Sequence, residues 1–286
     1  MRFALRTAVA AAFALAPLSI NAQTAGKNLA IDFRTTVTVS GMPDTGVILG
    51  HAVGSGDKLR MDLKMKGPGA QVSPLGSAAG QISMILSDSG KTVTYLDSTN
   101  SKYLRVRPSD MLAQAQQMGG LKMDFSGTEA KVDSLGVGPT VLGHPTSHYR
   151  IRSGMTVTIS AMGQEQTVKI TTSSDYYYAT DIKGVVNPFA SLSGSDMAAM
   201  FGSSNKEFAN KMKAMQQKLP RATPLRASSA SMIISQGQSR ITTTEAEVTS
   251  VQWVDANPKT FEVPSSYTAV TLPGMGPTQG GAIPPK

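Results

Sequence analysis

The chain of 286 residues contains no cysteine. This absence excludes disulfide bonds and also excludes the lipid-modified cysteine of a bacterial lipoprotein. Charged residues make up only 16% of the chain and aromatic residues 6%. No run of four or more Lys or Arg occurs, and no basic segment alternates with aromatic residues, so we expect no nucleic-acid partner. A chain with these absences must be stabilised by one sizeable apolar core.

The N-terminal apolar run is short. Arg2 and Arg6 come before the run Ala8–Leu15, which is about half as long as a bilayer-spanning helix. Small residues follow up to Ala22, and this order is typical of a secretory signal peptide over residues 1–22 with cleavage near Ala22. We therefore expect a periplasmic or secreted protein with no transmembrane segment in its mature chain. Loss of the two arginines would lower the formal net charge of +8 by two charges.

Beyond this leader the sequence alternates between apolar and polar residues. Leu59, Met61, Leu63 and Met65 are separated by Arg60, Asp62 and Lys64, a period of two that is typical of a strand with one buried face. Strands are predicted at Leu29–Val39, Val47–Val53, Lys58–Met65, Ile82–Leu86, Thr92–Leu96, Tyr103–Val106, Met123–Leu135, Val141–Arg152, Met155–Ala161, Gln166–Thr172, Tyr176–Ile182, Leu225–Ile234 and Ser239–Trp253. We expect a mainly β protein of about 10–12 antiparallel strands.

Helices are predicted at Pro108–Met118 and within Ser195–Leu219, where Gly202 divides the helical pattern. The strands and helices together indicate a single β domain over residues 23–272. Residues 273–286 are rich in Pro and Gly and lack an apolar pattern, so this tail is expected to be disordered.

Three segments occur in a recognisable order: LSDSGKTVTYLDSTNSKYLRVRPSD at Leu86–Asp110, TVLGHPTSHYRIR at Thr140–Arg152 and FEVPSSYTAV at Phe261–Val270. Together they resemble the periplasmic lipoprotein-carrier (LolA/LolB-like) superfamily, in an exported bacterial branch. The resemblance implies an incomplete antiparallel β-barrel, or half-barrel, covered by two or three helices, with an apolar interior for acyl chains. The chain departs from the carrier in its Ser195–Leu219 insertion, and no residue matches the carrier's ligand-binding arginine.

On this basis we expect noncovalent binding of a hydrophobic small molecule or lipid in the half-barrel. The candidate ligand-binding residues are Leu63, Met65, Met84 and Leu86 from strands, and Phe208, Met212 and Met215 from a helical lid. The three lid residues share one helical stripe, and lysines within Lys206–Lys218 surround it. The same helix would also suit simple packing on the sheet or contact with a membrane surface.

Two other functions fit the sequence. One is a non-enzymatic envelope structural or interaction protein, with a filled core and an envelope protein as its partner. The other is a periplasmic copper binder, because the thioethers of Met197 and Met200, or of Met212 and Met215, are soft ligands for Cu(I).

Residue patterns that could carry catalysis or bind a metal are weak. His144 and His148 have a helical ligand spacing, but Pro145 places them in a turn, so a metal site is not expected. The sequence Ser89–Thr92 is similar to the end of a phosphate-binding loop, yet it lies between two predicted strands and indicates a hairpin turn. No nucleophile elbow or paired-acid motif is present. We therefore predict no enzymatic activity, no cofactor and no metal.

Overall fold

The computed structural model describes residues 26–42, 45–67, 80–88, 91–107, 110, 122–161, 164–182, 187, 189 and 206–271. Its strands are β1 Lys27–Val39, β2 Gly46–Ser55, β3 Lys58–Lys66, β4 Gln81–Ser87, β5 Thr92–Asp97, β6 Lys102–Val106, β7 Lys122–Val137, β8 Thr146–Ala161, β9 Gln164–Ala179, β10 Pro224–Ser235, β11 Gln238–Asp255 and β12 Thr268–Ala269. The helices of this part of the chain are α3, Lys206–Gln216, and the 3-10 helix η4, Pro258–Phe261.

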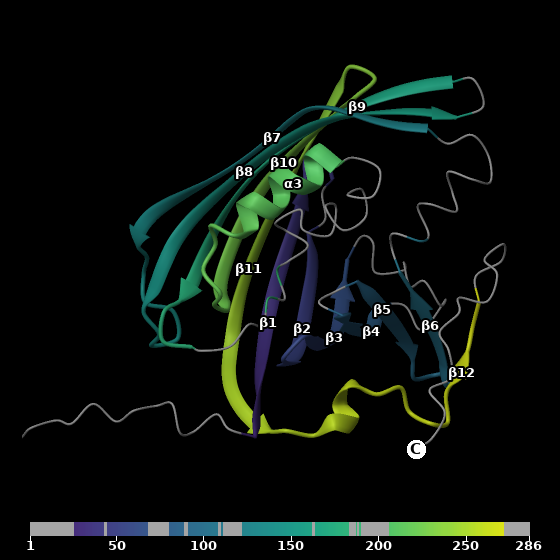
Figure 1. Ribbon diagram of the computed structural model, residues 1–286, viewed down its shortest axis with the longest axis vertical. Helices are drawn as coiled ribbons and strands as arrows, with labels where there is room; N and C mark the ends of the chain where they lie inside the picture. Colours follow the sequence, from purple (N-terminus) through teal and green to yellow (C-terminus); the bar gives the residue numbers. More distant parts are fainter. Residues whose placement is uncertain are drawn as a thin grey trace, which may run out of the picture.

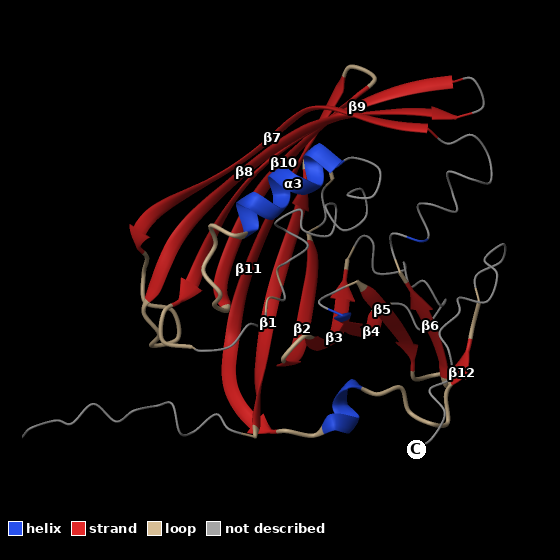
Figure 2. Cartoon of the chain, viewed as in Figure 1, coloured by secondary structure: helices blue, strands red, loops and turns tan. Residues whose placement is uncertain are grey.

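All twelve of these strands form one sheet, in the order β12-β6-β5-β4-β3-β2-β1-β11-β10-β9-β8-β7. Every neighbouring pair is antiparallel except β12 and β6, which are parallel. Pairing of β1 with β11 joins two antiparallel meanders, β1 to β6 and β7 to β11, into a continuous sheet. The sheet is strongly curved, so that β7 to β10 arch over α3 (Figures 1 and 2).

The main hydrophobic cluster lies on one face of this curved sheet, because apolar residues recur at every second position of the strands. Its buried members come from β1, β2, β7 to β11 and α3, and from two residues that follow β9, Ile182 and Phe189: Leu29, Ile31, Phe33, Ala52, Phe125, Ile151, Met155, Val157, Tyr176, Tyr178, Ala179, Ile182, Phe189, Met215, Leu225, Ala227, Ala246 and Val248. We call this side of the sheet the core face and the other side the outer face. A smaller set, Ala30, Val53, Ile85 and Leu96, is buried on the outer face.

One close approach fixes the packing between β1 and β2. The ring of Phe33 lies over Gly50, so closely that a Cβ at this glycine would be 2.1 Å from the ring atom Cζ. Phe189 packs edge-on against the same ring, with the centroids 5.6 Å apart. A glycine at position 50 is therefore required for Phe33 to reach across β2 into the core.

The structure corrects the expected half-barrel covered by two or three helices. The strands form one large open sheet, and α3 is the one α-helix of several turns in the described residues. The expected helix at Pro108–Met118 lies outside the described residues apart from Asp110, as does the first half of Ser195–Leu219. The prediction was wrong because most residues of the described part of the chain pair in the strands of one open sheet and few remain there for covering helices.

Two strand boundaries were also wrong. The predicted strands on either side of Gly154 form a single strand, β8, and those on either side of Ser174 form a single strand, β9. Gly154 takes an ordinary extended place opposite Thr171, so it interrupts nothing. In contrast, the predicted hairpin turn at Gln236 and Gly237 is confirmed, since both residues have the positive φ angles that such a turn requires. Residues 1–22 and 273–286 lie outside the described residues.

Candidate functional site

The core face changes character where it passes from β2 to β3 and β4. Seven apolar side chains of these two strands point to the core face and are only half-buried: Leu59, Met61, Leu63, Met65, Ile82, Met84 and Leu86. We call this set the β3/β4 apolar face. The alternation of apolar and polar residues puts them on one side, and Arg60, Asp62 and Lys64 on the other.

One row of neighbours across the strands shows how the β3/β4 apolar face differs from its surroundings. The strand register places in line Ile31, Ala52, Met61, Met84, Tyr95 and Leu104. The residues at the two ends of the row are buried, with Ile31 1% exposed and Leu104 3% exposed. Met61, Met84 and Tyr95 between them are half-buried. The row therefore contains a partly open apolar stretch between two closed ones.

The structure brings together the four strand residues predicted from the sequence. Leu63, Met65, Met84 and Leu86 all belong to the β3/β4 apolar face, and Leu63 also packs against the core. Met61, which was not among the candidate ligand-binding residues although it has the same alternation as Leu63, is the direct cross-strand neighbour of Met84.

The predicted lid residues lie on α3, which packs mainly against β7. Met215 is 4% exposed and belongs to the core cluster. The side chains of Phe208 and Met212 lie outside what the structure describes. Met215 is thus the one predicted lid residue whose side chain is described, and it lies in the core near the β7 end of the sheet.

The outer face of β8 to β10 carries a cluster of charged and aromatic side chains. Asp175 accepts hydrogen bonds from Arg150 Nε at 2.9 Å and from Arg150 Nη2 at 3.1 Å, and its Oδ1 is 2.7 Å from His148 Nε2. The His148 ring stacks on Tyr177 with centroids 4.5 Å apart. Burial acts to raise the pKa of Asp175, but the hydrogen bonds from Arg150 and His148 outweigh it and the pKa is lowered.

A second ion-pair group lies beside this cluster, on β7 and β8. The carboxylate of Asp133 bonds Arg152 and is 3.0 Å from the Nζ atom of Lys131. Hydrogen bonds from Arg152 and then Lys131 are the main reasons that the pKa of Asp133 is lowered. The two groups together link β7, β8 and β9 through charged pairs, so they tie the strands of the outer face to one another.

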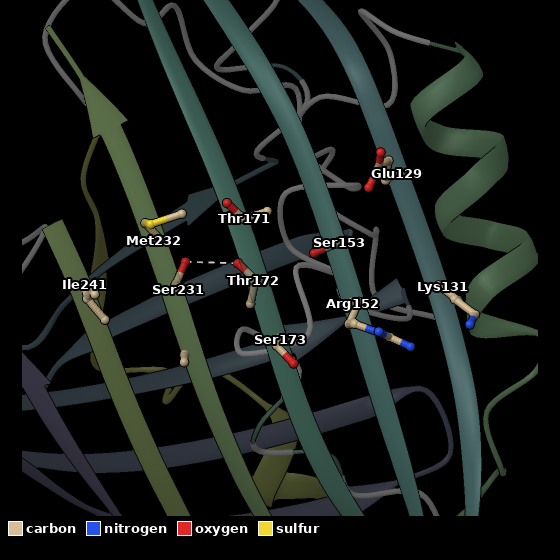
Figure 3. A pocket seen from close by; sticks show the side chains of 11 residues that line it. Glu129, Lys131, Arg152, Ser153, Thr171, Thr172, Ser173, Ser231, Met232 and Ile241 are labelled. Atoms are coloured by element: carbon tan, nitrogen blue, oxygen red, sulfur yellow. Dashed lines mark hydrogen bonds between the residues drawn. The ribbon is translucent and has the colours of Figure 1, made fainter. Parts of the chain in front are cut away.

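A groove of about 480 Å³ runs across β7 to β11 next to these ion pairs (Figure 3). Most of its lining residues point to the outer face by strand register: Glu129, Lys131, Arg152, Thr171, Ser173, Ala230, Met232 and Ile241. Gly154, which is paired with Thr171 and belongs to the outer face, has no side chain and so leaves room for the groove. The groove is separate from the β3/β4 apolar face and is lined by ionic side chains at one end and apolar ones at the other.

Each of the three histidines faces one aspartate. His51 lies 2.7 Å from Asp32, and His144 lies 2.8 Å from Asp181. His144 and His148, which share a helical spacing in the sequence, thus bond different carboxylates. Within the described residues, no group of three or more His, Cys, Asp or Glu side chains could hold a metal ion. Met197 and Met200, the first candidate copper pair, lie outside those residues.

In this same described part of the chain, none of the helices combines the length and the apolar character that crossing a lipid bilayer requires.

Comparisons with known proteins give little. No family model matches the chain, and no curated protein sequence matches it. Among solved structures, the chain is similar to a domain from Vibrio parahaemolyticus that is described as an outer membrane lipoprotein-sorting protein, with 6% identity over 79% of this chain and 85% of that one. This is the kind of protein that the sequence segments resemble, but a TM-score of 0.26 establishes neither a shared fold nor a shared function.

Proposed function

We propose that this chain is an exported protein that binds an apolar molecule, such as the acyl chain of a lipid, noncovalently against the β3/β4 apolar face. The observation that carries the proposal is the half-burial of seven apolar side chains on a face whose two flanks are buried. The proposal involves no reaction of the ligand. Binding would be driven by the removal of apolar surface of the ligand and the protein from water.

The composition of the face suits a flexible apolar ligand. Met61, Met65 and Met84 are three of its seven residues. Methionine is unbranched and polarizable, so it adapts to ligands of different shape. Each ligand methylene that becomes buried contributes about 0.8 kcal/mol. A chain of roughly eight methylenes would thus gain about 6 kcal/mol before the entropy of association is subtracted.

Substitution of one residue on each side of the sheet tests the proposal. Leu63→Asp places a charge on the β3/β4 apolar face and should weaken binding of a fluorescent fatty acid at least tenfold, because the carboxylate would lose its hydration. Gln81→Asp is the matched control: it adds the same charge at an exposed position of the outer face, next to Ile82, which is the cross-strand partner of Leu63. Equal binding by both variants, with unchanged circular dichroism spectra, would contradict the proposal. Met84→Gln, a milder change, repeats the test should Leu63→Asp unfold.

A second candidate function is supported by the other half of the sheet. There the core is filled by the protein's own side chains, with Tyr176 and Leu225 0% exposed. This is what a non-enzymatic envelope interaction protein with a solid core would need. Mass spectrometry of a solvent extract separates the two: the lipid-binding chain retains lipid in near-stoichiometric amount after purification, and the solid-core protein retains none.

A further inference from the structure

We infer that strand β7 is a docking edge for a second copy of this chain, and that two β7 strands pair antiparallel about Val132. The inference is independent of any ligand. It begins with the two edges of the sheet, which are very different. At one edge lies β12 with two residues, a length that offers almost no backbone for pairing. At the other edge lies β7 with 16 residues, paired with β8 on one side only.

Sheet proteins normally protect a long edge, since its free N–H and C=O groups can pair with another chain. In β7 the protective features found among the described residues lie at the ends of the strand. Register shifts against β8 occur between Ser126 and Glu129 and again between Ser134 and Gly136. Lys211 of α3 donates a hydrogen bond of 2.8 Å to the carbonyl oxygen of Thr128, at the first of these irregularities. Between them the residues Glu129–Ser134 form a regular strand whose outer edge meets no other described strand (Figure 1).

The charges of this regular segment select a second copy as the partner. In an antiparallel pair of strands, two residues directly opposite one another have their side chains on the same face of the sheet. In a symmetric dimer, the two-fold axis must therefore lie where one residue faces its own copy. An axis at Lys131 would oppose Lys131 to its own copy, and an axis at Asp133 would oppose two carboxylates. An axis at Ala130 would pair Lys131 with Glu129 but would place Val132 opposite Thr128, where the strand is irregular and bonded to Lys211. An axis at Val132 instead places Lys131 of each chain opposite Asp133 of the other, within the regular segment. Opposite charges that face one another across strands stabilise the pair, and like charges destabilise it.

The other residues of the segment fit the same register. Val132 points to the core face, where it packs against the apolar core, so the two copies of Val132 would meet as an apolar pair and extend that face. Ala130 would lie opposite Ser134, and both side chains are small. Lys131 Nζ already lies 3.0 Å from Asp133 of its own chain, and the lysine side chain is 66% exposed. It is therefore free to swing toward the second carboxylate.

Because the chain has no cysteine, a single introduced cysteine reports the register. Residues directly opposite one another across antiparallel strands have Cα atoms about 4.5–5.5 Å apart, within the range that a disulfide spans. Val132→Cys should therefore give a cross-linked dimer on mild oxidation of the purified full chain. Ala130→Cys is the matched control: its two copies would lie four residues apart, roughly 14 Å at 3.4 Å per residue, and should not cross-link.

Charge reversal gives a second, independent measurement by analytical ultracentrifugation. Lys131→Asp and Asp133→Lys should each weaken self-association by about tenfold or more, because each places like charges opposite one another twice in the dimer. An equimolar mixture of the two variants restores opposite charges at every position and should form a heterodimer. That recovery would not follow if the variants were merely misfolded. A monomeric native chain at all concentrations, cross-linking at Ala130→Cys as readily as at Val132→Cys, or a mixture that stays monomeric would overturn the inference.

Discussion

Phe33 shows how one small residue decides the shape of the core. Its ring crosses β2 only because Gly50 leaves room beneath it, and Phe189 then packs on the ring from the side. The same glycine separates the closed part of the core face from Leu63 on β3, which is its partner in the register. Residue size at position 50 therefore affects both the stability of the core and the boundary of the β3/β4 apolar face.

Substitution of Gly50 by alanine should destabilise the protein. The added methyl group would overlap the Phe33 ring, and overpacking of this kind costs about 1–3 kcal/mol. The measurement is the free energy of unfolding in urea. Gly154→Ala provides the control, since a Cβ there would lie 3.4 Å from the nearest atom, Thr171 Cγ2. A Gly50→Ala variant as stable as Gly154→Ala would contradict the account of Phe33.

On the outer face, Asp175 is a single residue that holds several others in place. Its carboxylate side chain is 21% exposed and is held by Arg150 and His148. Since its folded pKa is lowered, its contribution to stability is present above the unfolded pKa of about 3.9 and is lost as the pH falls through the folded value.

Asp175→Asn should lower the free energy of unfolding near neutral pH by about 1–3 kcal/mol, because charged hydrogen bonds are lost and their donors are left behind. The difference from the native chain should shrink as the pH falls below the unfolded pKa of about 3.9, and should be lost once the pH is below the lowered pKa of the folded carboxylate. Urea unfolding across a pH series measures both effects. Asp57→Asn, at an exposed turn, is the control and should follow the native curve. A difference that persisted unchanged at acid pH would argue against the charged interactions.

At the scale of secondary-structure elements, α3 has one strongly buried side chain among those that the structure describes. Met215 is 4% exposed and contacts the core, while Glu207 and Lys211 on the same helix form an exposed ion pair with a separation of 2.7 Å between Oε1 and Nζ. The pair lowers the pKa of Glu207 but lies in solvent, where such pairs contribute little. Burial of Met215 is therefore the main described link between this helix and the sheet.

Met215→Ala should reduce the free energy of unfolding by about 2–5 kcal/mol, the usual cost of a buried Met→Ala change that leaves a cavity. Lys213→Ala, at an exposed position of the same helix, should change it by no more than about 0.5 kcal/mol. Thermal unfolding followed by circular dichroism measures both. Similar midpoints for the two variants would show that α3 is not fastened to the sheet through Met215.

At the scale of the whole molecule, the sheet has a filled half and a partly open half. The β1 and β7 to β11 half supplies most of the buried core, and the β3/β4 apolar face belongs to the other half. The half formed by β1 and β7 to β11 fills its core face with its own side chains, and this burial stabilises the fold. The half that contains β3 and β4 can therefore leave apolar side chains half-buried. This division is the physical basis of the proposed ligand binding.

Export is a property of the whole chain as well. The leader predicted over residues 1–22 should be absent from protein recovered from the cell envelope or the medium. Its intact mass should correspond to a chain that begins at Gln23, and tandem mass spectrometry should find that N-terminal peptide. Recovery of an intact chain that retains Arg2 and Arg6 would contradict cleavage near Ala22.

Much of the local structure could be predicted because it depends on neighbouring residues. The alternation from Leu59 to Met65 predicted which side chains of β3 share a face, and the turn at Gln236 was predicted from residues that tolerate a positive φ. Gly154 shows the limit of this reasoning: a glycine indicates a turn in the sequence, but pairing on both sides kept β8 extended. The predicted cover of two or three helices joined a local helical pattern to a likeness to other proteins, and the described part of the chain instead forms one open sheet with α3 beside it.

The alternation of apolar and polar residues, together with the turn residues, determined that this is a mainly β chain. The alternation also determined which face of the sheet each side chain of a strand such as β3 takes. Both follow from the geometry of an extended backbone and need no tertiary information. Only the tertiary structure decided that β1 pairs with β11, that His148 meets Asp175, and that β7 ends the sheet. These depend on contacts between residues far apart in the chain. For the same reason Met61 is half-buried and Ile31 buried, although the two have the same local pattern: what covers a side chain is set by the distant segments that pack against it.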